Sequence, residues 1–431
     1  MNKLIVDDTL YLSKGDIFLL NKGKNYDVNY LINKAKEKEP SLIISSLKNK
    51  EIKHINNIKK YIKNYINNLN IHPTIIGVTG SNGKTSTTTI IYNILKHLNK
   101  KVMLIGTNGV YFESINLKTR NTTISNLSIH YLINKYLDND SYLIMELSSQ
   151  GYERIKNIKF DYIIYTNLDN EHLDYHKTMN NYFKAKIKIL NLVKNKKNLI
   201  INKDDYYGNK LIKKYKDATF YSLQDIQILN NNPISFIYKN KEIKTLLTSD
   251  FNIYNIFSSY LLLNKILKEE FIDKFLLIKA IKGRNNLIKY KSNKIIIDYA
   301  HTPKSVENIV KFYKSLNPSN LYVILGFGGN KDIKKRSIIL KNALNYTNNI
   351  IITEDNSRNE EFINIIKSSL KEETNNLIII QNRKEAIRYA ISLLKENDTL
   401  LILGKGNEEF ILKNNKMIKH SDYKEVKKWI N

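Results

Sequence analysis

The sequence predicts an α/β protein of three domains, because short apolar strands alternate with helical patterns along most of its length. Two stretches carry this prediction. In the first, a β-branched run at 74–78 leads through the turn Gly80-Ser81-Asn82-Gly83 into a helix that follows Thr85. In the second, the last third of the chain, five apolar strands are separated by helices, which indicates a mostly parallel, Rossmann-like sheet.

Residues 1–72 are predicted to form a small α/β domain without a chemical signature of its own. A turn leads into a strand at 15–20, a helix follows at 30–38, and a second strand lies at 41–45. Apolar residues at helical spacing predict one further, lysine- and asparagine-rich helix over 50–69.

Residues 73–283 are predicted to form the central domain, which carries a phosphate-binding loop. Strand, glycine-rich turn, Lys-Thr and helix form an arrangement in which backbone N–H groups and a helix N-terminus hold phosphates. Lys84 is expected to reach the β- and γ-phosphates, and the Thr85 hydroxyl to contact Mg²⁺. The strict pattern requires glycine at position 78, where Val78 stands, so an ordinary turn is the alternative.

Acidic and histidine side chains follow two further predicted strands of this domain. Glu146 lies near the end of the strand at 141–147, where a magnesium ligand is expected beside a phosphate loop; a solvated strand end is the alternative. The strand at 162–166 leads into 167–176, which holds two histidines and several acids. The helix at 180–194 carries Lys184, Lys186 and Lys188, and its pattern alone predicts a solvated face. Another helix is predicted at 252–267.

Residues 284–431 are predicted to form the last domain, after a hinge at Lys282-Gly283-Arg284. Its strands are expected at 294–298, 321–325, 350–353, 377–380 and 399–403. Thr302 is a good N-cap and Pro303 suits the first helical position. No G-x-G-x-x-G pattern follows the first strand, so we do not predict dinucleotide binding.

The composition limits the function classes. The net charge of +28 comes from lysines spread over every segment, without an arginine-rich stripe, and this predicts non-specific attraction to polyanions. A phosphate-loop protein that binds nucleic acid through its basic surface is nevertheless an alternative. The absence of cysteine excludes disulfides, and the sequence has neither a secretory signal nor a membrane-length apolar run, so we expect a cytoplasmic protein.

A set of ordered motifs resembles the Mur ligase family over nearly the whole length of the chain. The motifs are G-V-T-G-S-N-G-K-T-S from Gly77, N-T-T from Asn121, M-E-L-S-S-Q-G from Met145, T-N-L-x-x-E-H-L-D-Y-H from Thr166, Y-F-K-A-K from Tyr182, D-Y-A-H-T-P from Asp298, G-x-G-G-x-x-D-x-x-K-R from Gly326, D-N-S-R from Asp355 and G-K-G-N-E from Gly404. The resemblance implies a UDP-binding domain at 1–72, an ATP-binding domain at 73–283 and a Rossmann-like, amino-acid-binding domain at 284–431.

The chain is most similar to the Mur ligases that add the third amino acid of the peptidoglycan precursor. The resemblance implies that ATP phosphorylates the D-Glu γ-carboxylate of UDP-MurNAc-L-Ala-D-Glu and that the amine of meso-diaminopimelate attacks the acyl phosphate. It implies a monomeric enzyme of cell wall biogenesis, and so of cell shape and division, that uses ATP and Mg²⁺ with small-molecule substrates, without nucleic acid. An L-lysine-adding ligase of the same family and a folded but inactive ligase are the alternatives.

The resemblance also implies roles for individual residues. The ATP-binding residues are Gly80, Ser81, Asn82, Gly83, Lys84, Thr85, Ser86, Asn255, Arg284, Asp298 and His301. The metal ligands are Thr85, Glu146, His172 and Lys186, where Lys186 is carbamylated by carbon dioxide; Lys84, Lys186 and His172 are the catalytic residues. The UDP-dipeptide meets Asn121, Thr122, Thr123, Ser148 and a base that is Arg154 or, in another alignment, Lys156. Diaminopimelate meets Lys331, Asp355, Asn356, Ser357, Arg358, Gly404 and Glu408.

Several positions depart from the family pattern. The D-N-P-R motif of diaminopimelate enzymes lacks its proline here, but it keeps Arg358, whose guanidinium would grip a distal carboxylate that lysine lacks. Lys331 stands where diaminopimelate enzymes have arginine, Glu171 where the family has aspartate, and Asn407 where it has histidine. The N-terminal D-S-R signature is reduced to Asp8-Thr9-Leu10, so no uridine contact is predicted there.

Overall fold

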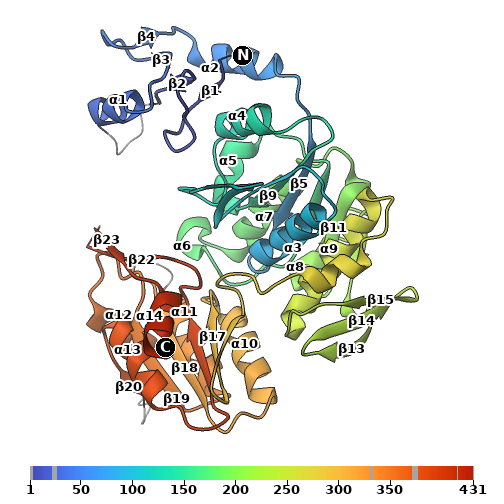
Figure 1. The fold of residues 1–431 in the computed structure, drawn as a ribbon, viewed down its shortest axis with the longest axis vertical. Coiled ribbons are helices and arrows are strands. Elements are labelled where there is room, and N and C mark those ends of the chain that lie inside the picture. Colours follow the sequence, from blue (N-terminus) through green and yellow to red (C-terminus); the bar gives the residue numbers. More distant parts are fainter. Residues whose placement is uncertain (1–2, 22–26, 331–332, 371–376, 415, 431) are drawn as a thin grey trace.

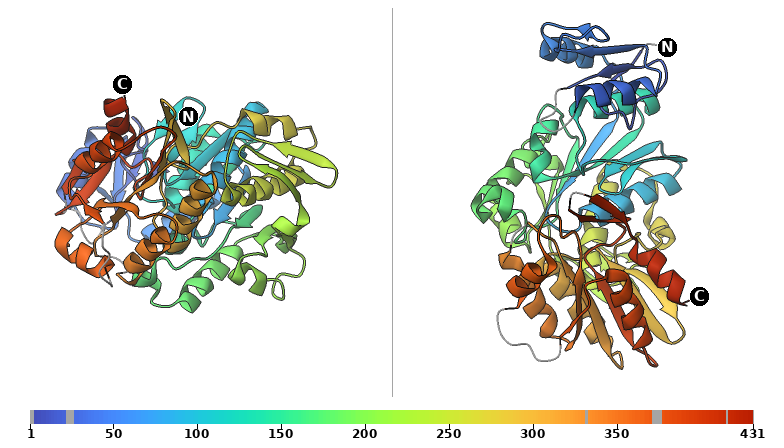
Figure 2. Two further views of the ribbon diagram at one scale, coloured as in Figure 1. Left: turned by 90° about the horizontal axis from the view of Figure 1, so that it is seen from below. Right: turned by 90° about the vertical axis from the view of Figure 1, so that its left-hand side faces the viewer.

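The computed structural model describes residues 3–21, 27–330, 333–370, 377–414 and 416–430. Three lobes follow one another along the long axis, in the order of the sequence, each built around its own sheet (Figure 1). The N-terminal and C-terminal lobes lie at opposite ends with the central lobe between them (Figure 2). An α/β architecture with a mostly parallel C-terminal sheet, as predicted, is confirmed.

The N-terminal lobe holds four parallel strands in the order β1-β2-β3-β4. Its elements are β1 (Ile5–Val6), β2 (Ile17–Leu19), α1 (Val28–Lys36), β3 (Leu42–Ser45), β4 (Lys53–His54) and α2 (Ile58–Asn67). The helix predicted over 50–69 is wrong in its first half. Asn57 accepts a hydrogen bond from the Lys60 N–H at 3.0 Å and so begins the helix late, while Ile52 is buried and leads into β4.

The central lobe contains an eight-stranded sheet in the order β12-β11-β10-β5-β9-β6-β7-β8. Its strands are β5 (Thr74–Thr79), β6 (Val102–Gly106), β7 (Gly109–Phe112), β8 (Ile115–Leu117), β9 (Tyr142–Leu147), β10 (Tyr162–Tyr165), β11 (Leu199–Asn202) and β12 (Thr219–Tyr221). All neighbours are parallel except in the β6-β7-β8 meander. This topology brings the carboxyl ends of β5, β9 and β10 side by side.

Separate apolar cores cover the two faces of this sheet. On one face lie α3 (Lys84–His97) and α9 (Asp250–Ile266); on the other lie α4 (Asn126–Tyr136) and α7 (Met179–Leu190). Shorter helices are η1 (Ser149–Gly151), α5 (Tyr152–Ile155), α6 (Leu173–His176), η2 (Lys196–Asn198), α8 (Tyr206–Lys210), η3 (Leu223–Asp225) and η4 (Ile272–Leu277). An antiparallel sheet of β13 (Gln227–Asn231), β14 (Ile234–Tyr238) and β15 (Lys241–Lys244) was not predicted; it lies beside α9 (Figure 1).

The C-terminal lobe contains a six-stranded sheet in the order β16-β17-β21-β18-β19-β20. Its strands are β16 (Asn286–Tyr290), β17 (Asn293–Asp298), β18 (Leu321–Phe327), β19 (Asn349–Glu354), β20 (Ile378–Ile379) and β21 (Thr399–Leu403). Only β16 is antiparallel to its neighbour. One face packs on α10 (Pro303–Ser315), α11 (Lys334–Leu344) and α12 (Phe362–Ser369), the other on α13 (Arg383–Ser392) and α14 (Asp422–Ile430). The hairpin of β22 (Phe410–Lys413) and β23 (Lys416–Lys419) lies at one end.

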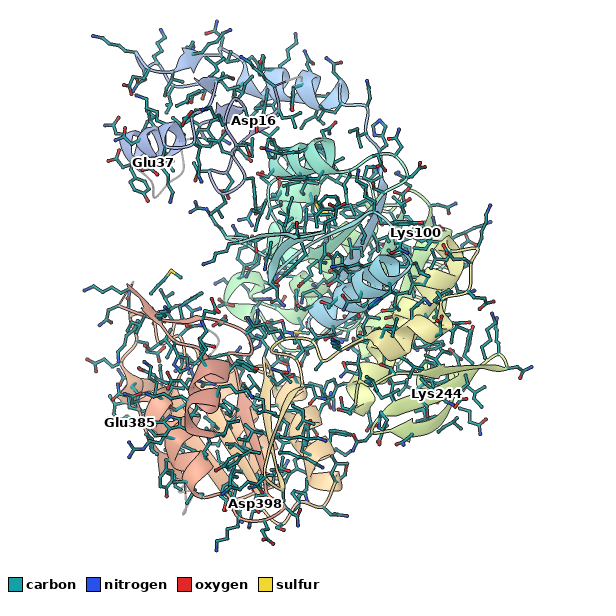
Figure 3. The ribbon with its side chains drawn as sticks, viewed as in Figure 1. Asp16, Glu37, Lys100, Lys244, Glu385 and Asp398 are labelled. Atoms are coloured by element: carbon teal, nitrogen blue, oxygen red, sulfur yellow. The ribbon has the colours of Figure 1, made fainter. Side chains whose placement is uncertain are left out.

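Helix α4 joins the first two lobes. The Tyr131 hydroxyl on α4 donates to Asp16 Oδ2 at 2.6 Å, and the Lys135 ammonium lies 3.3 Å from the same oxygen. Asp16 projects from the N-terminal lobe beside this helix (Figure 3). Buried residues of α4 belong to the same apolar core as residues of the N-terminal lobe and of the central sheet. Within the described residues, no helix has the length and apolar character needed to cross a membrane.

Candidate active site

The carboxyl edges of the central and C-terminal sheets face each other, and direct side-chain contacts join them. The Asn82 amide donates to the Thr302 hydroxyl at 3.3 Å, and the Arg284 guanidinium donates to the Thr85 hydroxyl at 3.2 Å. Loops at the carboxyl ends of parallel strands are where α/β proteins bind ligands. The candidate site therefore lies between the two lobes.

The predicted phosphate loop is a turn with a left-handed glycine directly before a helix N-terminus. Gly83 has a φ of +85°, and a Cβ there would lie 2.5 Å from Asn255 Oδ1. Helix α3 begins at Lys84, whose ammonium turns back to donate to the Gly80 and Ser81 carbonyls at 2.8 and 2.6 Å. Burial lowers the pKa of Lys84. Val78 is the buried partner of Glu146 within the sheet, so its side chain does not disturb the loop.

Beside the loop, hydroxyls and one carboxylate form an oxygen-rich cluster. The Thr85 hydroxyl donates to Glu146 Oε2 at 3.1 Å, and the Thr107 hydroxyl donates to the same oxygen at 2.9 Å. Gly106 leaves the room that Glu146 occupies, since a Cβ there would lie 2.3 Å from Glu146 Oε1. Hard oxygen ligands suit Mg²⁺, so Thr85 and Glu146 fit the ion that the resemblance implies. In the described part of the chain, no group of three or more His, Cys, Asp or Glu could hold a metal by itself.

Lys186 differs from the two other lysines of its helix. Lys184 and Lys188 are exposed, whereas Lys186 is buried and its ammonium donates to Gly80 O at 2.9 Å and Thr79 Oγ1 at 3.2 Å. The solvated face predicted from the helical pattern is therefore wrong for Lys186. Burial and the nearby Lys84 ammonium hold the pKa of Lys186 well below its usual range, which favours a neutral amine. The Tyr182 ring lies beneath this amine, and the Tyr182 hydroxyl contacts Ser81 Oγ at 3.0 Å.

Glu171 links two histidines from different lobes. Its Oε1 lies 3.1 Å from His301 Nε2 and 3.4 Å from His172 Nε2. Burial alone would raise the pKa of Glu171, but both imidazoles and Lys84 hold it well below its usual range. The other ring nitrogen of His301 contacts the Tyr299 carbonyl at 2.8 Å. An ionised Glu171 thus orients His301 at the boundary between the lobes.

Three other residues predicted to bind ATP lie around the loop and the boundary between the lobes: Asp298, Asn255 and Ser86. Asp298 accepts the backbone N–H groups of Asn285 and Ala300 at 2.5 and 2.7 Å, and burial raises its pKa. It therefore fixes the turns that carry Arg284 and His301. Asn255 accepts the Thr87 hydroxyl at 3.3 Å. Ser86 is buried in the first turn of α3.

The residues predicted to meet the UDP-dipeptide gather near the end of β9. The Thr123 hydroxyl lies 3.2 Å from Ser148 Oγ, and the Arg154 guanidinium donates to the Thr123 carbonyl at 2.9 Å. Lys156 instead forms an exposed ion pair with Glu153. These contacts favour Arg154 over Lys156. Thr122 Oγ1 lies 3.1 Å from Thr107 Oγ1, and Asn121 is exposed in the same turn.

A pocket opens at the carboxyl edge of the C-terminal sheet. Its lining includes five of the residues predicted to bind the amino acid, which are Asp355, Asn356, Arg358, Gly404 and Glu408. Tyr299, His301 and residues of β18 and α11 also line the pocket. Arg358 has a φ of +55° and donates to the Gly329 carbonyl at 2.7 Å. Lys331 lies outside the described residues. Ser357 is buried, and its backbone N–H donates to the Asp355 carbonyl.

Two buried basic residues at this pocket were missed by the sequence prediction. Lys405 is fully buried and forms ion pairs with Asp355 and Glu408. Arg336 is 1% exposed, forms two 2.7 Å hydrogen bonds with Glu360, and donates to the Gly328 carbonyl at 3.0 Å. Lys405 stands in a loop and Arg336 in the first turn of α11, both inside quoted motifs, but lysine and arginine predict exposure unless their acidic partners are known.

Comparisons with known proteins agree with this geometry. Two family models match the chain. The model of the Mur ligase middle domain matches residues 78–263, and that of the Mur ligase glutamate ligase domain matches residues 283–406. A UDP-N-acetylmuramoyl-L-alanyl-D-glutamate–2,6-diaminopimelate ligase of Clostridium botulinum is 35% identical over 84% of this chain and 79% of its own length. One of Aquifex aeolicus is 36% identical over 78% of this chain and 73% of its own.

Solved structures share the fold over almost the whole chain. The MurF ligase of Thermotoga maritima in complex with ADP matches with a TM-score of 0.73 and 18% identity, over 99% of this chain and 97% of its own. A solved UDP-N-acetylmuramoyl-L-alanyl-D-glutamate–2,6-diaminopimelate ligase matches with a TM-score of 0.59 and 23% identity. The match covers 99% of this chain and 94% of that protein. At these identities the structural matches establish the three-lobed fold alone.

Proposed function

The chain belongs to the Mur ligase family, and on that premise we propose that it joins meso-diaminopimelate to UDP-MurNAc-L-Ala-D-Glu with ATP, forming ADP and phosphate. Curated relatives that carry the name of this activity align over most of their length. This reaction makes a peptidoglycan precursor, and so it would serve cell wall biogenesis.

One observation carries the choice of amino acid. The pocket at the C-terminal sheet contains both a guanidinium, on Arg358, and a carboxylate, on Glu408. The distal end of diaminopimelate has a carboxylate and an ammonium, and each would find a partner of opposite charge in this pocket. L-Lysine has only the ammonium at that end, so Arg358 would be left without its partner.

The chain's own residues would do three kinds of work. Lys84, Arg284 and the N-terminus of α3 would neutralise charge on the transferring phosphoryl group. Thr123, Ser148 and Arg154 would hold the UDP-dipeptide so that its γ-carboxylate faces the phosphate loop. The pocket around Glu408 would hold the amino acid so that its amine attacks the acyl phosphate.

Magnesium and a lysine carbamate are part of this proposal. Thr85, Glu146 and His172 would hold Mg²⁺, which when bound supplies positive charge to phosphate oxygens. Lys186 is suited to carbamylation because its buried amine contacts only neutral oxygens among the hydrogen bonds found for it, at Gly80 and Thr79. A carbamate there would place a negative charge beside the phosphate loop, where Lys84 donates to the same Gly80 carbonyl. We also propose that the enzyme is monomeric and works in the cytoplasm, where ATP is supplied.

The test is phosphate release from ATP and Mg²⁺ by the purified full-length protein. The reaction would contain UDP-MurNAc-L-Ala-D-Glu and either meso-diaminopimelate or L-lysine. Release that requires diaminopimelate supports the proposed function, and mass spectrometry of the UDP-tripeptide identifies the product. Release with L-lysine alone would keep the family and contradict the role given to Arg358. No release from folded protein would contradict the proposed activity.

A further inference from the structure

Lys405 lies behind the lining of the pocket at the C-terminal sheet and contacts three of its residues. It lies in the turn after β21, between Gly404 and Gly406, whose φ angles are +106° and +54°. Its side chain is 0% exposed. A lysine ammonium loses much of its hydration when it is buried, so it persists only where acceptors surround it.

Three acceptors surround the Lys405 ammonium, and all belong to residues predicted to bind the incoming amino acid. The Nζ atom lies 2.7 Å from Glu408 Oε2, 3.0 Å from Asp355 Oδ1 and 3.1 Å from Asn356 Oδ1. These acceptors come from two separate loops, one after β19 and one after β21. Lys405 therefore ties together the two loops that form the pocket.

The contact with Asn356 fixes which way its amide faces. A lysine ammonium can only donate, so the Asn356 oxygen must face it, and the Leu412 N–H holds the same oxygen at 2.9 Å. The Asn356 NH₂ group then faces away and donates to Glu408 Oε2 at 3.0 Å. One of its two hydrogens is used there, and the second can serve a ligand carboxylate.

The contact with Glu408 divides the work between its two oxygens. Oε2 accepts from both Lys405 and Asn356, whereas Oε1 accepts only a longer contact of 3.4 Å from the Tyr299 hydroxyl among the bonds found for it. Oε1 is thus the oxygen best placed to accept a ligand ammonium. Burial alone would raise the pKa of Asp355, but Lys405 and Arg383 hold it below its usual value.

We propose that Lys405 is a positioning residue for amino-acid selection. It holds Glu408 and Asn356 so that an acceptor and a donor stand side by side for the ammonium and carboxylate of one zwitterionic end of the substrate. The proposal rests on the proposed function, since it names the residue that prepares the pocket for that substrate. Lys405 does not itself touch the substrate.

The first test replaces the ammonium by a group of similar shape, in Lys405→Met. Phosphate release is measured while diaminopimelate, UDP-dipeptide and ATP are varied in turn. We expect the KM for diaminopimelate to rise about tenfold or more, and the other two KM values to stay within about twofold. The matched control is Lys384→Met. Lys384 is an exposed lysine of the same lobe, paired with Glu425, and its replacement should leave all three KM values unchanged. An unchanged KM for diaminopimelate, or three KM values that rise together, would overturn the proposal.

A second test uses the absence of cysteine from the chain. Lys405→Cys would carry the only thiol, which can be alkylated in denaturant with 2-bromoethylamine or 1-bromopropane before refolding. The products have nearly the same shape, but only the aminoethyl form carries an ammonium. We expect the aminoethyl form to regain a KM for diaminopimelate within about threefold of wild type and the propyl form to resemble Lys405→Met. Equal KM values for the two forms would show that the ammonium has no positioning role.

Lys405→Met and Lys405→Cys are the variants that could fail to fold. In that case Lys405→Met/Glu408→Gln is compared with Glu408→Gln, because the double variant removes two opposite charges together. Leu412 still holds the Asn356 oxygen, so the two KM values for diaminopimelate should agree within about threefold. A further tenfold rise in the double variant would contradict action through Glu408. A wild-type protein that neither turns over nor binds diaminopimelate would overturn the proposed function together with this inference.

Discussion

Arg284 donates from the C-terminal lobe to the hydroxyl of Thr85, the residue after the phosphate-loop lysine, at 3.2 Å. The guanidinium also lies 4.2 Å from the centre of the Tyr299 ring, and the Tyr299 hydroxyl reaches Glu408. Arg284 and Tyr299 thus connect the predicted phosphate loop to the pocket at the C-terminal sheet. The arrangement would let the C-terminal lobe supply positive charge to the phosphates that we propose the central lobe binds.

Arg284→Ala should lower kcat/KM for ATP by about 10²-fold, because a preorganised cation at the phosphoryl group is lost. Arg284→Lys should recover only part of this loss, since lysine keeps the charge but not the planar stack on Tyr299. Phosphate release at varied ATP measures both. Lys282→Ala, an exposed residue of the same hinge, is the matched control. If kcat/KM for ATP were the same in Arg284→Ala and in Lys282→Ala, Arg284 would not stabilise charge at the phosphoryl group.

Arg358→Ala should raise the KM for diaminopimelate by roughly 10- to 100-fold, the cost of one charge-assisted hydrogen bond. Any weak turnover with L-lysine should change by less than about threefold, because lysine lacks the carboxylate that Arg358 would bind. The ratio of kcat/KM for the two amino acids is therefore the measurement. A variant whose ratio stays at the wild-type value would show that Arg358 does not read the distal carboxylate.

Lys186 is expected to carry a carbamate, and this can be observed without turnover. Protein equilibrated with ¹³C-bicarbonate should show a carbamate carbonyl resonance in its ¹³C spectrum. Lys186→Arg should lack this resonance, because a guanidinium does not add carbon dioxide, and it should lose most phosphate release. Lys184 lies two residues earlier on the exposed face of α7, so Lys184→Arg should keep both the carbamate resonance and phosphate release. A resonance that survives in Lys186→Arg would assign the carbamate elsewhere.

The sequence predicted much of this arrangement because local chemistry and tertiary structure agree at several points. Thr302 accepts from the Ser305 N–H and begins α10 with Pro303 in its first turn, as predicted. The strand predicted at 399–403 has these bounds in the structure, as β21. The helix predicted over 50–69 is wrong in its first half because Ile52 and Ile55, which flank the two-residue strand β4, have the three-residue spacing of a helix face.

The buried charges could not be predicted from the sequence alone. Lys186 lies between two exposed lysines on a pattern that indicates a solvated helix face, and only the resemblance to a family singled it out. Lys405 acquires its environment from Asp355, 50 residues away, and so depends on the order of strands in the sheet. Sequence spacing along one loop carries no information on which other loop lies opposite it.

The pair of Arg383 and Asp422 should make the stability of the C-terminal lobe depend on pH. Both side chains are 0% exposed, and two hydrogen bonds of 2.7 and 2.8 Å join α13 to the start of α14. Burial alone would raise the pKa of Asp422, but Arg383 and His420 hold it well below its ordinary value. Asp422→Asn should therefore lower the free energy of unfolding by about 3 kcal/mol at pH 7, since it leaves a buried guanidinium without its anion.

The sign of the pH dependence follows from the depressed pKa. The stabilisation is fully present above the unfolded-state pKa of about 3.9 and is lost as pH falls toward the lower pKa of the folded state. Urea unfolding at pH 7, 5 and 3 should show a constant difference between wild type and Asp422→Asn at the first two values and a smaller one at the last. The exposed Asp140→Asn should show no such difference. A difference that stays constant down to pH 3 would mean that Asp422 is not the anion that stabilises Arg383.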